Sequence, residues 1–191
     1  MAKVHFISHP EITVDPETPV EKWRLSDKGI ARMRAYARSA PPFDAIWSSS
    51  EAKAIEAAGV LAAGMGLPIE IDARLGENDR SATGFLPPPE FEKTADAFFA
   101  NPEQSIRGWE RAIDAQRRIV EAVYAIASRF ADDASIAIVA HGGVGTLLLC
   151  KLMNVPISRA YDQPHQGHVF SFDARTNALS HGWRSIDASS I

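Results

Sequence analysis

Short apolar runs along the chain alternate with longer stretches in which apolar residues recur every three or four positions. The runs at residues 3–8, 43–47, 69–71 and 135–140 predict β-strands. Helical spacing predicts helices that begin near Ser26, after Ser50, at Trp109 and after Gly143. This order predicts an α/β protein, a three-layer α/β/α sandwich in which helices cover both faces of a mostly parallel sheet.

Local signals mark where these elements begin and end. Ser26 is expected to cap the first helix, and Pro41-Pro42 to end it. Residues 168–173 and 179–184 predict the two strands of a hairpin with its turn at 175–177. The last part of the chain therefore adds antiparallel strands to the sheet.

The regular pattern stops between residues 78 and 108. This stretch contains Gly84 and three consecutive prolines, Pro87 to Pro89, with helical spacing only from Phe91 to Phe99. We predict a single domain spanning residues 1–191, with an excursion at about 78–108 that lies over the active face.

Composition limits the size of the core, the kinds of partner and the cellular location that we expect. A chain of 191 residues that is 46% hydrophobic buries one substantial core. The formal net charge of −4 provides no field that attracts nucleic acid or an anionic membrane, so we expect neither as a partner. Cys150 is the one cysteine and lies among leucines, which indicates a core thiol and excludes an internal disulfide. The apolar run after Met1 is too short for a signal peptide, so a cytoplasmic location is expected.

Polar residues follow each of the predicted parallel strands. His9 follows the first strand, Lys53 the second, Glu77 the third and His141 the fourth. Because the carboxyl ends of parallel strands meet at one edge of a sheet, we expect these side chains to converge there. The edge would then hold two imidazoles, one cation and one carboxyl group.

Each of these residues also has an ordinary structural interpretation. A histidine at a strand end is more often a hydrogen-bonded structural residue, Lys53 would by default be solvated on its helix, and Glu77 a loop carboxylate. Ser48 to Ser50 would cap the helix that follows them, although a helix N-terminus also binds phosphate. Both interpretations stay open at this point.

Two other motifs are weak. Gly143-Val144-Gly145 is similar to part of a dinucleotide-binding fingerprint, but Leu148 stands where glycine or alanine is needed. His165 and His168 have only Asp162 nearby as a further metal ligand. We therefore expect no metal site and no bound cofactor.

Five motifs in a fixed order carry a resemblance to a known family. The chain resembles the histidine phosphatase superfamily, the phosphoglycerate-mutase-like proteins, whose fold it is then expected to share. The family's motifs Arg-His-Gly, Leu-Thr/Ser-x-x-Gly, Ser-Ser-x-x-x-Arg-Ala, Leu-x-Glu and Val-x-His-Gly-Gly correspond here to Ser8-His9-Pro10, Leu25-Ser26-Asp27-Lys28-Gly29, Ser48-Ser49-Ser50-Glu51-Ala52-Lys53-Ala54, Leu75-Gly76-Glu77 and Val139-Ala140-His141-Gly142-Gly143.

The resemblance implies a catalytic role for three residues. His9 would attack a phosphoryl group and form a phosphohistidine, which water then hydrolyses. Glu77 would protonate the departing ester oxygen and later accept a proton from water. His141 would donate hydrogen bonds to phosphoryl oxygens, aided by backbone N–H groups of Gly142 and Gly143. This scheme needs no metal.

The chain departs from the family pattern at three positions. Ser8 and Lys53 replace arginines that bind phosphate, and Pro10 replaces a glycine and removes an N–H. We expect Ser8, Lys53 and Gly142 to contact the substrate. Loss of one charge-assisted hydrogen bond weakens phosphate binding by roughly tenfold to a hundredfold. Candidates for restoring the positive charge are Arg80, His165 and His168.

Three functions are consistent with these motifs. The first is metal-independent hydrolysis of a small phosphomonoester through phosphohistidine. The second is a non-catalytic member of the same fold that binds a phosphorylated or other anionic ligand. The third, a phosphomutase, is least expected, because the excursion over residues 78–108 is short for a lid that excludes water. Neither the leaving group nor the oligomeric state follows from the sequence.

Overall fold

A computed structural model describes residues 2–187 of the chain. Met1 and residues 188–191 of the predicted domain lie outside the described residues. Six strands form one sheet in the order β3-β2-β4-β1-β5-β6. Their bounds are β1 Lys3–Ser8, β2 Ala45–Ser48, β3 Ile69–Ile71, β4 Ser135–Ala140, β5 His168–Asp173 and β6 Leu179–Ser185.

The four strands from β3 to β1 run parallel, whereas β5 and β6 are antiparallel to their neighbours. In the pairing of β1 with β4, Lys3 lies opposite Ser135 and Ser8 opposite Ala140. The two central strands therefore end at the same level, and the residues that follow them leave the sheet side by side.

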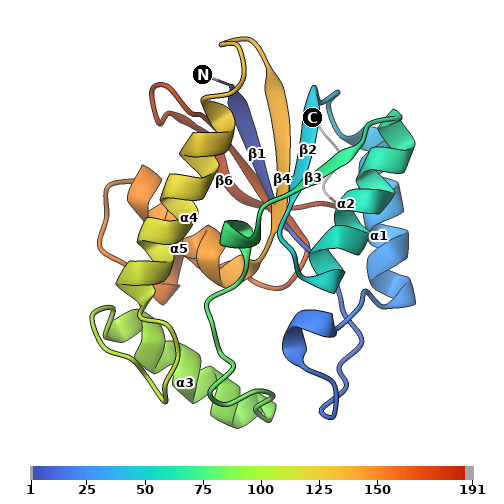
Figure 1. The fold of residues 1–191 in the computed structure, drawn as a ribbon. Coiled ribbons are helices and arrows are strands. Elements are labelled where there is room, and N and C mark those ends of the chain that lie inside the picture. Colours follow the sequence, from blue (N-terminus) through green and yellow to red (C-terminus); the bar gives the residue numbers. More distant parts are fainter. Residues whose placement is uncertain (1, 188–191) are drawn as a thin grey trace.

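Helices cover both faces of this sheet. The helices α1 (Asp27–Ser39) and α2 (Ala52–Met65) pack on one face, and α4 (Ala112–Ala127) and α5 (Gly142–Leu152) on the other (Figure 1). Alternate residues of β1 point to opposite faces, so Phe6 joins the core beneath α4 and α5 while Ile7 joins the core beneath α1 and α2. This arrangement confirms the predicted three-layer α/β/α sandwich with a mostly parallel sheet.

The bounds of β1, β3, β4 and β5 agree with the sequence pattern, and β6 extends one residue further than predicted. Ser26 caps α1, because its side chain accepts a hydrogen bond from the Gly29 N–H. The prediction for β2 was wrong at both ends, since the strand begins at Ala45 and includes Ser48. The N-cap of α2 is Glu51, so none of the three serines is the capping residue.

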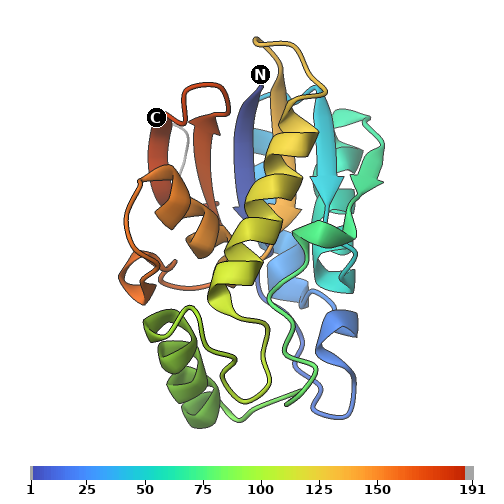
Figure 2. The same ribbon diagram turned by 60° about the vertical axis from the view of Figure 1, so that its left-hand side comes forward.

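The segment between Asn78 and Gly108 contains α3, Pro88–Ala100, a longer helix than the spacing of Phe91 to Phe99 predicted. Proline occupies its first turn, where a missing N–H costs no hydrogen bond. In Figure 2 this helix, in green, lies beyond the carboxyl ends of the parallel strands. Within residues 2–187, no helix is long and apolar enough to cross a membrane.

Two helical glycines should respond in opposite directions to an added methyl group. A Cβ on Gly29 would lie 2.2 Å from the Glu11 backbone oxygen, whereas a Cβ on Gly59 in α2 would meet nothing within 4 Å. We predict that Gly29→Ala lowers the free energy of unfolding by about 1–3 kcal/mol, because backbone must shift. Gly59→Ala should raise it by about 0.5–1 kcal/mol.

Urea unfolding of both variants beside the parent chain tests this pair. Equal effects of the two substitutions would contradict the close packing of α1 against the loop at Glu11.

Candidate active site

The segments that follow β1, β2, β3 and β4 line one cavity of about 560 Å³ at the carboxyl edge of the sheet. They contribute His9, Lys53, Glu77 and Gly142, in that order. The structure thus brings together residues that lie up to 133 positions apart in the sequence, as the parallel strands predicted. His141 and Ser8 lie just behind this lining and are fully buried.

His9 is held in one tautomer by its own neighbour. Its main chain extends the pairing of β1 with β4, since the His9 N–H donates to the Ala140 oxygen at 3.0 Å. The ring Nδ1 lies 2.9 Å from the Pro10 oxygen. A carbonyl oxygen only accepts, so Nδ1 carries the proton and Nε2 keeps a free lone pair. Burial lowers the pKa of His9 to about 4, which leaves the ring neutral near pH 7.

The second imidazole lies directly beside the first. The ring centroids of His9 and His141 are 5.2 Å apart in a T-shaped arrangement. His141 Nε2 lies 2.7 Å from Ser49 Oγ and 3.3 Å from Glu51 Oε1. Burial lowers the pKa of His141 to about 3. Its Nδ1 has no hydrogen-bond partner among the described residues, so this ring retains one unused polar atom.

Glu77 closes the N-terminus of α5. Its carboxylate oxygens accept hydrogen bonds from the N–H groups of Gly143 at 3.0 Å and Val144 at 2.9 Å, and from its neighbour Asn78 at 3.1 Å. Negative charge is favoured at a helix N-terminus. The Gly143 N–H, which the family resemblance assigns to a phosphoryl oxygen, is therefore donated to Glu77.

Lys53 is buried rather than solvated, so its ordinary structural interpretation was wrong. Only 2% of the residue is exposed, and its Nζ donates to the Val20 oxygen at 2.8 Å. Nζ also lies 2.5 Å from Glu51 Oε2. The ammonium lines the cavity, but an internal carboxylate already accompanies it.

Glu51 is the residue that sequence reasoning missed. One of its oxygens faces Lys53, while the other faces His141 and accepts the Glu77 N–H at 2.8 Å. Burial opposes ionisation, but these three contacts outweigh it and lower the pKa of Glu51 to about 2. The available signal was an acidic residue inside the Ser-Ser-x-x-x-Lys-Ala motif, two positions before Lys53.

Ser8 reaches the cavity only through another side chain. Its hydroxyl lies 2.5 Å from Gln163 Oε1 and accepts the His168 N–H at 3.0 Å. Gln163 lines the cavity and packs closely against Gly142, since a Cβ added to Gly142 would lie 2.2 Å from Gln163 Nε2. The Ser8 hydroxyl thus orients Gln163, and its contact with a substrate stays a prediction.

The three candidates for restoring positive charge differ in position. Arg80 and His165 line the cavity, whereas His168 does not. The Arg80 guanidinium lies over the rings of Phe91 at 5.3 Å and Trp109 at 5.6 Å. Within residues 2–187, no group of three or more histidine, cysteine or acidic side chains is arranged to hold a metal ion.

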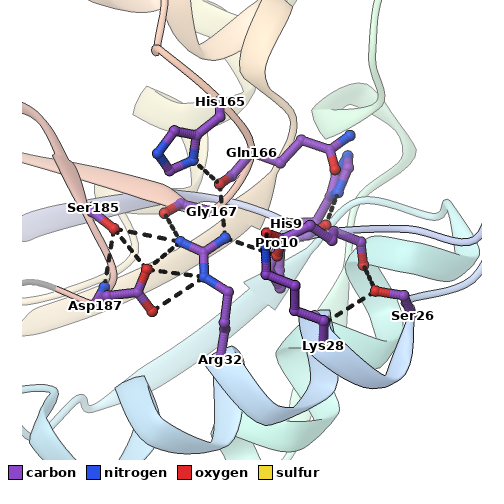
Figure 3. A network of polar contacts seen from close by, with 12 residues as sticks. His9, Pro10, Ser26, Lys28, Arg32, His165, Gln166, Gly167, Ser185 and Asp187 are labelled. Atoms are coloured by element: carbon purple, nitrogen blue, oxygen red, sulfur yellow. Dashed lines mark hydrogen bonds and ion pairs between the residues drawn. The ribbon is translucent and has the colours of Figure 1, made fainter.

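A partly buried arginine on α1, Arg32, fixes the loop beside His9 (Figure 3). Arg32 donates to the backbone oxygens of Gln166 at 3.0 Å and Gly167 at 3.3 Å, and it also bonds Asp187. The Gly167 N–H in turn donates to the His9 oxygen at 3.1 Å. A Cβ on Gly167 would lie 2.7 Å from the guanidinium, and its φ of +79° favours glycine. Arg32 thus supports both the main chain at His9 and one wall of the cavity.

Solved structures with a similar fold include proteins named as phosphatases. A mycobacterial glucosyl-3-phosphoglycerate phosphatase in complex with inorganic phosphate has a TM-score of 0.79 at 21% identity, covering 99% of this chain and 100% of that chain. An Entamoeba histolytica phosphoserine phosphatase in complex with 3-phosphoglyceric acid has a TM-score of 0.78 at 15% identity, covering 97% and 98%. A putative alpha-ribazole-5'-P phosphatase from Escherichia coli has a TM-score of 0.77 at 19% identity, covering the whole of both chains.

At these identities the likeness establishes the fold, and the family is established by sequence. A search of curated proteins finds no match. The family model described as histidine phosphatase superfamily (branch 1) matches residues 16–178, which is most of the chain. That match begins after Ser8-His9-Pro10 and includes the other four motifs. Since the fold also agrees with it, the chain belongs to the histidine phosphatase superfamily.

Proposed function

We propose that this chain is a metal-independent phosphomonoester hydrolase in which His9 Nε2 is the nucleophile. The observation that carries the proposal is the state of His9. Its Nδ1 proton is donated to the Pro10 oxygen, burial keeps the ring neutral, and the residue lines the cavity. A neutral imidazole with one nitrogen fixed and the other free is suited to attack on phosphorus.

The reaction would take two steps. In the first, His9 Nε2 forms a bond to phosphorus and the bond to the ester oxygen breaks. Glu77, which must take up a proton when the anionic ligand binds, donates that proton to the departing oxygen. In the second, Glu77 takes a proton from water, the water oxygen bonds to phosphorus, and the phosphorus–nitrogen bond breaks. Inorganic phosphate leaves, and His9 returns to its neutral form.

The cavity walls indicate what kind of leaving group fits. Away from His9, the lining is mainly apolar and includes Trp23, Phe85, Phe91 and Trp109. Trp23 and Phe85 lie 5.9 Å apart between ring centroids, and Phe91 and Trp109 lie 6.0 Å apart. Apolar and aromatic walls favour a substrate whose alcohol part is apolar or aromatic.

Replacement of the nucleophile tests the proposal. We expect the parent chain to hydrolyse p-nitrophenyl phosphate in the presence of EDTA, and His9→Ala to lower kcat/KM by at least about 1,000-fold. The matched control is His181→Ala, because His181 lies on β6 and does not line the cavity.

The control variant should keep the parent activity. Hydrolysis that persists in His9→Ala, or that requires a metal, would contradict the proposed mechanism.

A second candidate function is binding of an anionic ligand without turnover. The observation that favours it is Glu51, whose carboxylate already contacts Lys53 and His141. These are two of the groups that the resemblance assigns to phosphate, and the departure at Ser8 removes a third. Phosphate binding by a chain that never hydrolyses the aryl ester would favour this candidate.

Removing the charge of Glu51 should strengthen phosphate binding. We predict that Glu51→Gln raises the affinity for inorganic phosphate at least about tenfold, because a buried carboxylate no longer repels the ligand. The matched control is Glu56→Gln on the same helix, whose carboxylate pairs with Arg24 instead. Isothermal titration calorimetry measures both. An unchanged or weaker affinity in Glu51→Gln would show that Glu51 does not compete with phosphate.

Burial of neutral histidine should also make the fold sensitive to acid. The pKa of His9 is about 4 in the folded chain against a usual value of 6.5, so the unfolded chain takes up the proton first. Stability is therefore present above pH 6.5 and is lost as the pH falls toward 4. His5 and His141 shift in the same direction.

We predict that the free energy of unfolding is lower at pH 5 than at pH 7, and that this loss is about 2 kcal/mol smaller in His9→Asn. Urea unfolding at the two pH values measures the difference. The same loss in both proteins would show that His9 does not resist protonation.

A further inference from the structure

Most of the donors expected to bind phosphoryl oxygens already have partners inside the protein. Lys53 contacts Glu51, the Gly143 N–H is donated to Glu77, and Ser8 contacts Gln163. Phosphoryl oxygens gather negative charge and need donors that are not already engaged. The cavity must therefore supply other groups if it receives an oxyanion.

Asn78 supplies one such donor. It follows Glu77 directly, lines the cavity and is only 6% exposed. Its Nδ2 is buried and has no hydrogen-bond partner among residues 2–187. Buried polar groups are nearly always paired, so an unpaired buried amide on a residue that lines the cavity indicates a missing partner atom. The Asn78 N–H is donated to Glu77 Oε1, which holds this residue in place beside the proposed acid.

Arg80 supplies a charge two positions further along. Its guanidinium lies over Phe91 and Trp109 and lines the cavity. Among the described cations that line the cavity, Lys53 and Arg159 contact carboxylates, while Arg80 has no carboxylate contact. Stacking on two rings holds the plane of a guanidinium and leaves its N–H edges available for bidentate bonds.

The positive charge of Arg80 acts on the imidazole of His9, the proposed nucleophile. Burial is the main cause of the lowered pKa of His9, and the positive charges of Lys53 and Arg80 lower it further. A guanidinium keeps its charge at every pH at which the protein folds. Asn78 and Arg80 are therefore a neutral donor and a permanent cation on the same short segment as Glu77.

We propose that Asn78 Nδ2 and the Arg80 guanidinium bind oxygen atoms of the ligand's phosphoryl group, in place of the family arginine that Ser8 replaces. This inference takes its ligand class from the proposed function. It moves the main oxygen-binding groups from the end of β1 to the segment after β3. Lys53 then serves to hold Glu51, and phosphate binding does not require the two arginines that Ser8 and Lys53 replace.

Isothermal titration calorimetry of the full chain with inorganic phosphate tests the proposal, because it measures binding without any need for turnover. We expect Arg80→Gln to weaken phosphate binding by about 10- to 100-fold, because a charge-assisted hydrogen bond is lost. Asn78→Ala should weaken it by about 3- to 10-fold, because a neutral donor is lost. Arg80→Lys should lie between the parent chain and Arg80→Gln, since it keeps the charge without the planar fork.

The matched control is Arg107→Gln. Arg107 lies on the same excursion, pairs with Glu90 and does not line the cavity, so its removal changes the net charge without changing the site. Thermal unfolding of each variant establishes that it is folded. A loss of phosphate binding in Arg107→Gln as large as that in Arg80→Gln would overturn the proposal. The loss would then come from the change in the protein's net charge and not from a contact between Arg80 and phosphate.

The failure of this inference and the failure of the hydrolase proposal are distinguishable. If phosphate binding falls in both variants but the parent chain hydrolyses no ester, the oxygen-binding role stands and the catalytic role fails. If the parent chain hydrolyses the ester and neither variant changes phosphate affinity or KM, the catalytic role stands and the oxygen-binding role fails. A parent chain that binds no phosphate would also overturn the assignment of Asn78 and Arg80.

Discussion

The parallel pairing of β1 with β4 is the constraint on which the rest of the site depends. Ser8 lies opposite Ala140, and the next hydrogen bond in the series joins the His9 N–H to the Ala140 oxygen. His9 and His141 therefore leave the sheet at the same level, which brings their ring centroids to 5.2 Å. A shift of one residue in this register would turn one imidazole to the opposite face of the sheet.

Around this pair, internal carboxylates take the positions where a ligand's negative charge is expected. Glu77 receives the N–H groups at the start of α5, and Glu51 contacts Lys53 and His141. Such contacts satisfy buried donors and keep the site ordered in the absence of a ligand. They also mean that an incoming oxyanion must displace a carboxylate or bind to other groups. Within residues 2–187, Asn78 Nδ2, the Arg80 guanidinium and His141 Nδ1 are groups that no carboxylate engages.

The two halves of the cavity have different origins. The polar floor is built on strand ends and is held rigidly, with Arg32 tying the loop at Gly167 to the His9 main chain. The apolar wall comes largely from the excursion between Asn78 and Gly108, where Phe91 of α3 faces Trp109. Ligand sites in proteins commonly combine a few fixed polar groups with mainly apolar walls in this way.

Much of the fold was readable from the sequence because it rests on short-range physics. The apolar run at residues 135–140, the Ser26 cap and the alternation of strand with helix each express a local preference, and together they predict the layers and the sheet edge that carries His9 and His141. The error at β2 arose because Phe43 is buried in the core beneath α1 and α2, with its ring centroid 5.1 Å from that of His5, without belonging to the strand.

The partners of each charged side chain were decided only by the tertiary structure. Nothing in the sequence distinguishes a solvated Lys53 from one that is 2% exposed beside Glu51, or a substrate-binding Ser8 from one that orients Gln163 across 155 positions of chain. Hydrogen bonds and ion pairs between distant segments are made or lost by shifts of a few tenths of an ångström in the separation of their atoms. The periodicity of the sequence therefore determined at which edge of the sheet these polar residues meet, while tertiary packing determined which of them already have partners inside the protein.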